Sequence, residues 1–319
     1  MRAMNSSRAA VYCVANSIYF PGVVALVNSL RLVGHRQPVY ILDCGLTADE
    51  RELLSGEAHI VPAPGDAPPW FLKTVAPLRY PAEVMVLIDA DIVVTRPLDE
   101  LIETAAAGRV VGIEHGSARF FPEWGRLLGL GAPRRQPYVT SSLLLLDCAL
   151  GGQVLALVDR SLPRVKLGDS PFAADSPEDG LSVDVRTEAI EEPFFFPEQD
   201  VLNAVLAAEL DRERLVVLDR RLEAIPPFEG LRIADVGTLR CSYEDGLEPY
   251  AVHHLASKPW LETTPYGVYT QLFLRVLLGR DVAIRLRPRD LPPHLRIGVR
   301  GRVSRMFEGA LGRIRTRAR

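Results

Sequence analysis

Two aspartates separated by one residue follow an apolar run in the stretch VMVLIDADIVV. Asp89 and Asp91 come directly after the apolar residues 84–88, which predict a buried strand. In extended chain, residues i and i+2 point to the same side, so both carboxylates can face one cation. Two carboxylates with open positions suit Mg²⁺ or Mn²⁺, which also bind phosphate oxygens. The pair therefore indicates a divalent cation site, with an ordinary surface pair as the alternative.

The same two aspartates also fit the first motif of the haloacid dehalogenase phosphatases. There the first aspartate would be the nucleophile and the second the general acid. That family carries the motif on its first strand and needs an acidic pair at a later strand end. Here the motif follows several earlier strands, and the best later strand end has Asp219 followed by two arginines. We therefore prefer the cation site and keep the phosphatase as an alternative.

The elements that position this pair alternate over the first 150 residues. Apolar runs predict strands at residues 10–15, 38–46, 59–64, 83–94, 110–115 and 138–150. Helical patterns lie between them, at residues 21–34, 47–56, 71–81 and 97–108. Thr47 and Glu50 have the spacing of a capping box at one helix start. This alternation predicts a doubly wound, mostly parallel α/β sheet with Asp89 and Asp91 at its ligand-binding edge.

The pattern loosens beyond residue 150. Residues 160–198 are rich in Pro, Asp and Ser and predict a long surface loop. A helix is predicted at 197–210, a strand at 215–219, and a strand that runs into a tight Lys-Pro turn at 249–260. One α/β domain with a helical C-terminal extension is the simplest organisation.

The composition is that of an ordinary globular protein with a large core. The chain has 319 residues, of which 48% are hydrophobic and 24% charged. Its four cysteines are far apart and form no C-x-x-C pair, which favours free thiols in a reducing compartment. No run approaches the 18 or so apolar residues of a transmembrane helix, and the N-terminus fits a first strand better than a signal peptide. We therefore expect a cytoplasmic protein.

Charge is distributed unevenly along the chain. Residues 280–319 hold twelve arginines against three acidic residues, a net charge of +9, so residues 1–279 carry −12 of the total of −3. The basic end predicts peripheral contact with an anionic surface, such as the inner face of a membrane, and a solvated tail explains it equally well. No nucleic acid partner is expected. Only Lys73, Lys166 and Lys258 are lysines against 34 arginines, a bias typical of a GC-rich bacterial genome.

Five stretches between residues 10 and 262 resemble the retaining nucleotide-sugar glycosyltransferases of family eight, which include glycogenin and bacterial galactosyltransferases of lipooligosaccharide synthesis. They are VANSIYF, FLKTVAPLRYPAEVMVLIDAD, YVTSSLLLLD, PEQDVLN and VHHLASKPW. The last matches the family signature H-x-x-G-x-x-K-P-W in Lys258, Pro259 and Trp260, although Ala256 replaces the usual glycine. The resemblance implies a GT-A fold, a Rossmann-like, mostly parallel twisted sheet flanked by helices, over residues 1–262. An Arg-rich helical extension would occupy 263–319.

The resemblance also implies a metal site and a diphosphate contact. Asp89 and Asp91 would bind Mn²⁺ or Mg²⁺ together with His253, and His254 is the alternative because the spacing before the lysine is one residue short. Lys258 would contact the diphosphate. Lys258 and Lys73 fall at family lysine positions in a chain that otherwise uses arginine, which favours a need for a compact ammonium group against phosphate.

The nucleotide of a UDP-sugar donor would lie along the first strand end. Tyr19 can stack on uracil and the amide of Asn16 can read a polar edge, whereas a helix cap and core packing are the alternative explanations. Lys73 would be a basic donor contact, with Arg79 a less certain companion. The complete set of residues that the resemblance assigns to donor binding is Cys13, Ala15, Asn16, Tyr19, Lys73, Ala90, Thr140, Ser141 and Lys258.

The transferred sugar would be held by two further stretches. Thr140-Ser141-Ser142 replaces the family's Asn-Ser-Gly, so the family amide is missing and the sugar or acceptor preference can differ. The catalytic candidates are Glu198, Gln199 and Asp200, and helix N-capping is the alternative for these residues. Front-face transfer, in which the leaving phosphate takes the acceptor proton, and double displacement with Glu198 or Asp200 as nucleophile both stay open.

The expected activity is metal-dependent transfer of a sugar from a nucleotide-sugar to an acceptor hydroxyl with retention of anomeric configuration. A non-catalytic sugar-nucleotide binding protein on the same scaffold is the alternative from another class. The acceptor, whether a glycan, a lipid-linked glycan or a small molecule, is expected near residues 117–138, which bring aromatic side chains and two arginines to the mouth of the site. A lid or an oligomer contact would explain that segment equally well. The sequence does not specify the oligomeric state.

Overall fold

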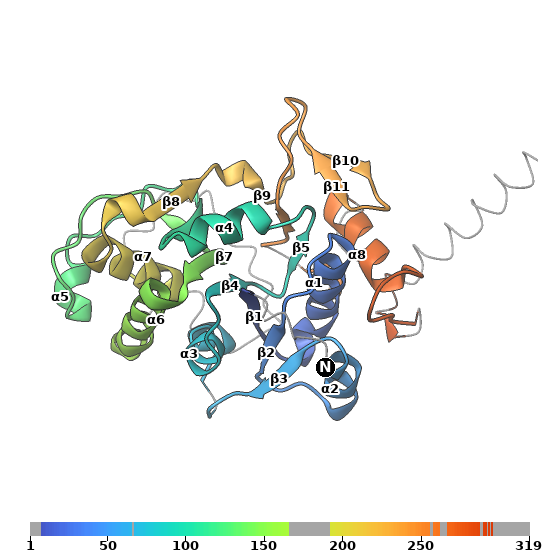
Figure 1. The fold of residues 1–319 in the computed structure, drawn as a ribbon, viewed down its shortest axis with the longest axis horizontal. Coiled ribbons are helices and arrows are strands. Elements are labelled where there is room, and N and C mark those ends of the chain that lie inside the picture. The colour runs from blue at the N-terminus through green and yellow to red at the C-terminus, as the bar shows by residue number, and fades with distance from the viewer. Residues whose placement is uncertain are drawn as a thin grey trace, which may run out of the picture.

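The computed structural model describes residues 8–65, 67–165, 192–255, 258–261, 267–287, 290–291, 293 and 295. Its main layer is a seven-stranded sheet with the strand order β3-β2-β1-β4-β7-β6-β8 (Figure 1). The strands are β1 (Ala9–Ala15), β2 (Val39–Asp43), β3 (His59–Pro62), β4 (Val84–Ile88), β6 (Val110–Glu114), β7 (Val139–Asp147) and β8 (Leu215–Leu218). Strand β7 pairs antiparallel with β4 and β6, and the other pairings in this sheet are parallel. The mostly parallel α/β fold predicted from the sequence is confirmed.

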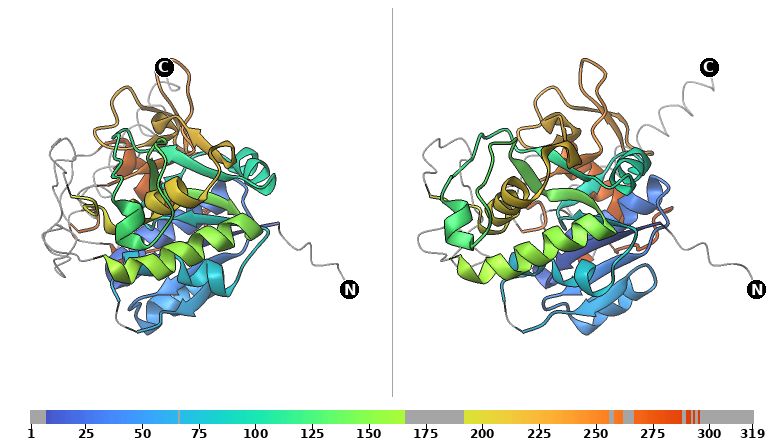
Figure 2. Two further views of the ribbon diagram at one scale, coloured as in Figure 1. Left: turned by 90° about the vertical axis from the view of Figure 1, so that its left-hand side faces the viewer. Right: turned by 60° about the vertical axis from the view of Figure 1, so that its left-hand side comes forward.

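The two faces of this sheet bury separate cores, because alternate residues of a strand point to opposite faces. On β1, Val11 and Cys13 belong to one core, and Ala10 and Tyr12 to the other. The first core is covered by α1 (Phe20–Leu32), α2 (Ala48–Ser55), α4 (Asp99–Ala106) and α8 (Val268–Leu278). The second is covered by α3 (Val75–Arg79), α5 (Trp124–Leu128), α6 (Cys148–Ser161) and α7 (Pro197–Glu209) (Figure 2).

The apolar run at 83–94 is not the single strand that its pattern predicts. It divides into β4 and β5 (Ile92–Val94), because the amide of Ile92 donates to the carbonyl of Asp89 and turns the chain there. Strand β5 belongs to a second, three-stranded sheet with the order β5-β12-β9, in which β12 is Ala251–His253 and β9 is Glu223–Ala224. A two-stranded hairpin of β10 (Arg232–Asp235) and β11 (Arg240–Ser242) lies beside it. The turn between β4 and β5 therefore joins two sheets.

Several predicted boundaries move. The helix predicted at 71–81 divides into a 3₁₀ turn, η2 (Pro69–Leu72), and the short helix α3. The strand predicted to reach 150 ends at Asp147, whose side chain accepts from the amide of Leu150 and begins α6. The capping box of Thr47 and Glu50 at α2 is confirmed. Of the predicted loop at 160–198, residues 166–191, including Lys166, lie outside the described residues.

The C-terminal part of the described chain packs on the first helix. Asn28 of α1 is fully buried, and its amide group donates to the carbonyls of Val276 and Ile284 at 2.8 and 2.6 Å. The domain boundary at 262–263 stays a prediction, and helix α8 beyond it belongs to the same core as α1. The Arg-rich residues 296–319 lie outside the described residues. None of the described helices is long and apolar enough to cross a membrane.

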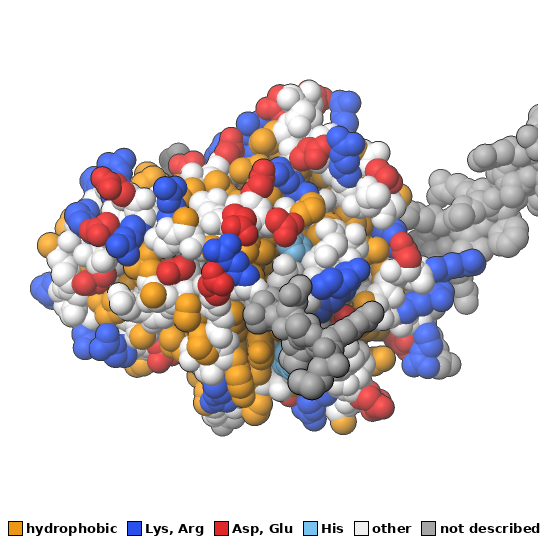
Figure 3. All heavy atoms as spheres, viewed as in Figure 1, with side chains coloured by type: hydrophobic (Ala, Val, Ile, Leu, Met, Phe, Trp, Pro, Cys, Tyr) orange, Lys and Arg blue, Asp and Glu red, His pale blue; other side chains and the backbone are white. Residues whose placement is uncertain are grey.

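The surface is of mixed charge on the face that Figure 3 shows. Acidic and basic side chains are interspersed there, and an apolar band lies over the region of α3 and β2 (Figure 3). Tyr40 of β2 stacks on both Tyr12 and Tyr80, with ring centroids 5.4 and 5.3 Å apart.

Candidate metal and donor site

The direction of β7 brings three hydroxyl side chains to the turn between β4 and β5. Because β7 runs antiparallel to β4, its first residues lie beside the carboxyl end of β4, with Ile88 paired to Leu143. The amide of Asp89 donates to the carbonyl of Ser142 at 2.9 Å. Thr140, Ser141 and Ser142 therefore lie at the edge of the sheet where ligands bind in open α/β folds.

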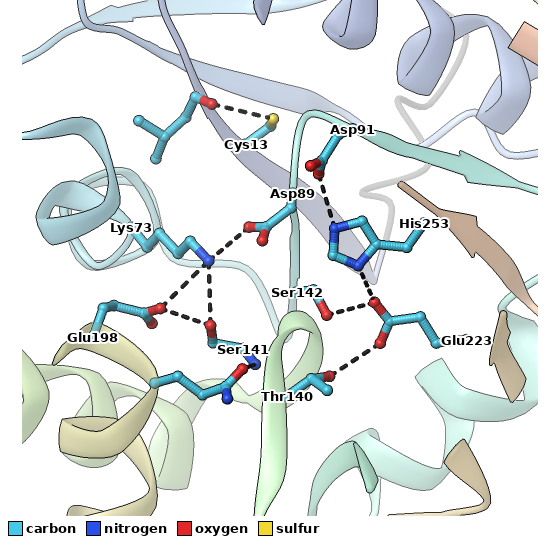
Figure 4. Close-up of polar contacts among 12 residues, drawn as sticks. Cys13, Lys73, Asp89, Asp91, Thr140, Ser141, Ser142, Glu198, Glu223 and His253 are labelled. Carbon is cyan, nitrogen blue, oxygen red and sulfur yellow. Dashed lines mark hydrogen bonds and ion pairs between the residues drawn. The ribbon is translucent and has the colours of Figure 1, made fainter. Parts of the chain in front are cut away.

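Asp89, Asp91 and His253 form a compact set of groups that could hold a metal ion. One ligand atom from each lies within 4.8 Å of the others, and His253 Nε2 is 3.1 Å from Asp91 Oδ1 (Figure 4). The neighbouring ring of His254 packs instead against Tyr269, with ring centroids 5.0 Å apart. Two carboxylates and one imidazole are a mixed oxygen and nitrogen donor set that fits Mn²⁺ or Mg²⁺. Of the two histidines, the geometry favours His253 as the ligand.

Glu223, at the start of β9, holds the other side of the His253 ring. Its Oε1 atom lies 2.6 Å from His253 Nδ1. Because an ionised carboxylate only accepts hydrogen bonds, Nδ1 carries the proton and Nε2 faces Asp91. Burial alone lowers the pKa of His253, but the negative charges of Asp91 and Glu223 outweigh burial and raise that pKa to about 10.

The two lysines predicted to contact the donor each pair with one aspartate. Lys73 Nζ lies 2.7 Å from Asp89 Oδ1, and Lys258 Nζ lies 2.5 Å from Asp91 Oδ2. Burial by itself raises the pKa of Asp91, but Lys258 and His253 outweigh it and hold the pKa far below its usual range. Burial likewise lowers the pKa of Lys73, and Asp89 with Glu198 raises it above its usual value. Both lysines therefore place an ammonium group directly beside one of the two aspartates.

Lys73 also links the metal site to the predicted catalytic segment. Its ammonium lies 3.4 Å from Glu198 Oε2 and donates to Ser141 Oγ at 3.3 Å (Figure 4). The Ser141 hydroxyl in turn donates to Glu198 at 2.6 Å, and Gln199 Oε1 accepts from the Ser141 amide. Burial raises the pKa of Glu198, and Lys73 offsets part of that rise. The structure thus brings Lys73, Ser141, Glu198 and Gln199 together beside Asp89.

Asp200, the third catalytic candidate, faces a different group of residues. It is fully buried, and its two oxygens accept from Arg119 Nε and Nη2 at 2.8 and 2.9 Å. Tyr138 OH and the amide of Phe196 donate to the same carboxylate. The contacts with Arg119 and Tyr138 tie the start of α7 to the segment that leads into β7, as Asn203 does with both backbone groups of Val139.

The predicted nucleotide turn follows β1. Asn16 accepts from the amide of Tyr19 at 3.2 Å and so caps the 3₁₀ turn η1 (Ser17–Tyr19), which is the capping role considered for it. The Tyr19 ring meets Trp260 edge-on, with centroids 6.0 Å apart, and Trp260 Nε1 donates to the carbonyl of Ile18. Trp260 of the Lys-Pro-Trp stretch therefore packs against the 3₁₀ turn that follows β1. The remaining predicted donor residues are buried, namely Cys13 at 2%, Ala15 at 2% and Ala90 at 6% exposure.

Three residues at this site were missed in the sequence. Glu223 follows two arginines in a stretch without any recognisable motif. Tyr269, on α8, donates from its hydroxyl to the carbonyl of Asp91 at 2.8 Å. Gly22, on α1, packs against the carbonyl of Ala90. Each contacts the site through a long-range pairing, which no local spacing reveals.

Comparison with known proteins identifies the fold. No family model and no curated protein sequence matches the chain. Among solved structures, the galactosyltransferase LgtC, in complex with donor and acceptor sugar analogues, matches with a TM-score of 0.52 at 12% identity over 83% of this chain and 95% of LgtC. The bifunctional glycosyltransferase WbbM matches with a TM-score of 0.55 at 12% identity over 89% of this chain and 51% of WbbM. The chain therefore has the GT-A glycosyltransferase fold that these proteins share, as the sequence predicted.

Proposed function

We propose that this protein is a metal-dependent glycosyltransferase that moves a sugar from a nucleotide-sugar, a UDP-sugar, to an acceptor hydroxyl with retention of anomeric configuration. The observation that carries the proposal is the set of ligand atoms from Asp89, Asp91 and His253 within 4.8 Å of one another at the ligand-binding edge of a GT-A sheet. Lys73 and Lys258 add two ammonium groups beside that set. A divalent cation and two ammonium groups in this arrangement would stabilise the negative charge of a diphosphate leaving group.

The residues have separate roles in this proposal. Asp89, Asp91 and His253 would hold Mn²⁺ or Mg²⁺, which, when bound, supplies Lewis-acid neutralisation of the leaving diphosphate. Lys258 and Lys73 add positive charge next to the same phosphates. Glu198 and Gln199, ordered by Ser141, orient the transferred sugar and stabilise the positive charge that develops on it.

Front-face transfer fits the site better than double displacement through Asp200. Arg119, Tyr138 and the Phe196 amide already donate to both oxygens of Asp200, so that carboxylate is held as a structural anchor. Glu198 is paired with Lys73, which suits electrostatic support of the sugar. In this mechanism the leaving diphosphate accepts the proton of the acceptor hydroxyl.

The test is release of the free nucleotide from a panel of UDP- and GDP-sugars, with and without Mn²⁺. We expect metal-dependent turnover with at least one UDP-sugar, and loss of that turnover in Asp91→Asn. Full activity of Asp91→Asn in the presence of Mn²⁺ would overturn the proposal. Donor binding without turnover would identify a sugar-nucleotide binding protein, and phosphate release from a phosphomonoester without any sugar donor would identify a phosphatase.

A further inference from the structure

Glu223 is a buried carboxylate that joins both sheets at the metal site. It is 2% exposed and lies at the first residue of β9, which pairs with β12. Its Oε1 atom lies 2.6 Å from His253 Nδ1 and also accepts from Ser142 Oγ at 2.6 Å. Its Oε2 atom accepts from Thr140 Oγ1 at 3.0 Å (Figure 4). Both oxygens are therefore engaged, with one partner on the small sheet and two on the large sheet.

The two hydroxyl partners coincide with the two departures from the Asn-Ser-Gly pattern. Thr140 and Ser142 stand where that pattern has asparagine and glycine, and both donate to Glu223. Ser141, which keeps the pattern, contacts Lys73 and Glu198 instead. The departures thus supply the hydrogen bonds that a buried carboxylate at position 223 needs.

The negative charge at position 223 acts most strongly on one of its three partners, the ring of His253. The hydroxyls of Thr140 and Ser142 need one acceptor oxygen each, and the charge only strengthens their hydrogen bonds. The His253 ring differs, because a carboxylate on Nδ1 fixes the tautomer, aims Nε2 at Asp91 and raises the basicity of that nitrogen toward a cation. Burying an ionised carboxylate costs desolvation free energy. The contact with His253, which depends on that charge, therefore indicates what Glu223 does.

We propose that Glu223 is a positioning residue that holds His253 in its metal-binding orientation and thereby sets the affinity of the site for a divalent cation. The inference rests on the proposed function, since it takes Asp89, Asp91 and His253 as the cation ligands. Glu223 acts through His253.

The test measures binding of Mn²⁺ alone to the full chain, from the free-ion signal in electron paramagnetic resonance. Glu223→Gln keeps the size of the side chain, removes its charge and replaces one acceptor oxygen by an NH2 group, and we expect Mn²⁺ to bind about 10- to 100-fold more weakly. Glu223→Asp keeps the charge on a side chain that is one methylene shorter, so it should also weaken Mn²⁺ binding. If Glu223→Gln does not fold, Glu223→Asp is the variant that tests the proposal. Ser142→Ala leaves the contact with His253 intact and should change Mn²⁺ affinity by less than Glu223→Gln does.

Glu57→Gln is the matched control. Glu57 is a partly buried carboxylate that pairs with Arg31 at 2.8 Å on α1, outside the site, so its loss should leave Mn²⁺ affinity unchanged. Thermal unfolding of each variant separates loss of stability from loss of binding. Unchanged Mn²⁺ affinity in both Glu223 variants would overturn the positioning role while leaving the proposed function intact. Absence of Mn²⁺ binding to the wild-type chain, with and without UDP, would overturn the proposed metal dependence and the positioning role with it.

Discussion

A Cβ atom on Gly22 would lie 2.3 Å from the carbonyl oxygen of Ala90, the residue between the two aspartates of the proposed metal site. The same atom would lie 2.8 Å from the ring of Trp260. Only glycine therefore lets the first turn of α1 approach the turn between β4 and β5. The close approach fixes where Asp89 and Asp91 present their carboxylates.

Gly22→Ala should disturb the metal site more than it disturbs the fold. The methyl group must displace the Ala90 backbone or the Trp260 ring, at a cost of about 1–3 kcal/mol in the free energy of unfolding. We expect weaker Mn²⁺ binding and lower nucleotide release. Gly152→Ala in α6 is the control, because a Cβ at Gly152 meets open space and the helix gains propensity. Equal effects of the two substitutions on Mn²⁺ binding would contradict the role given to Gly22.

We expect the compact positive charge of Lys73, which lies between the carboxylates of Asp89 and Glu198, to contribute to catalysis. Lys73→Gln leaves Asp89 and Glu198 without their shared cation, and we expect kcat/KM for a UDP-sugar to fall about 10- to 100-fold, the range of a lost charged hydrogen bond. Lys73→Arg keeps the positive charge but replaces the compact ammonium by a larger, planar guanidinium. It should therefore retain more kcat/KM than Lys73→Gln but less than the wild-type chain. Steady-state kinetics of the three proteins measure this. Wild-type kcat/KM in the glutamine variant would show that Lys73 is only a structural ion pair.

We expect Asp200→Asn to lower the stability of the fold and not to remove a group that takes part in catalysis. The substitution leaves Arg119 buried against a neutral partner, which we expect to lower the free energy of unfolding by about 3–5 kcal/mol. Combining it with Arg119→Met should cost less than the sum of the two single substitutions, because the two side chains act as a pair. Denaturant unfolding gives both values. A stable Asp200→Asn protein that has lost kcat selectively would instead support Asp200 as the nucleophile of a double displacement.

His35 should make stability depend on pH below neutrality. Its Nε2 atom accepts from the amide of Leu98, at the start of α4, at 2.8 Å. Burial lowers the pKa of His35 below its ordinary value of 6.5, so the unfolded chain binds the proton more readily than the folded one. The contribution of neutral His35 is therefore complete above pH 6.5 and is lost as the pH falls below it.

The corresponding measurement is Tm at about pH 8 and about pH 5.5, a range in which histidine titrates. His35→Gln keeps an acceptor but does not titrate, so its Tm should fall less than that of the wild-type chain over this interval. Parallel pH profiles for the two proteins would contradict the assignment to His35.

Local sequence patterns predicted the strands and the capping box of α2. The positions of the site residues relative to one another depend on pairings between residues far apart in the chain. The capping box of Thr47 and Glu50 depends on residues three apart, and the structure confirms it. The direction of β7 could not be predicted, since a run of buried leucines is equally apolar in either direction. Yet that direction is what brings Thr140 to Glu223. The aspartates were predicted as a pair, whereas Glu223 has no signal in a single sequence because its partners are distant in the chain.

Because the site is divided between two sheets, its residues are made at different times during synthesis on the ribosome. Every strand of the large sheet that the structure describes has been made once the chain reaches Leu218, and α1 and α4 can already cover it. Strand β5 then still lacks both of its sheet companions, because β9 begins at Glu223 and β12 ends at His253. A nascent chain of that length would carry both aspartates with neither their histidine nor their lysine at position 258. If the proposed function holds, cation binding therefore requires the finished domain, and we expect a product truncated at Leu218 not to bind Mn²⁺.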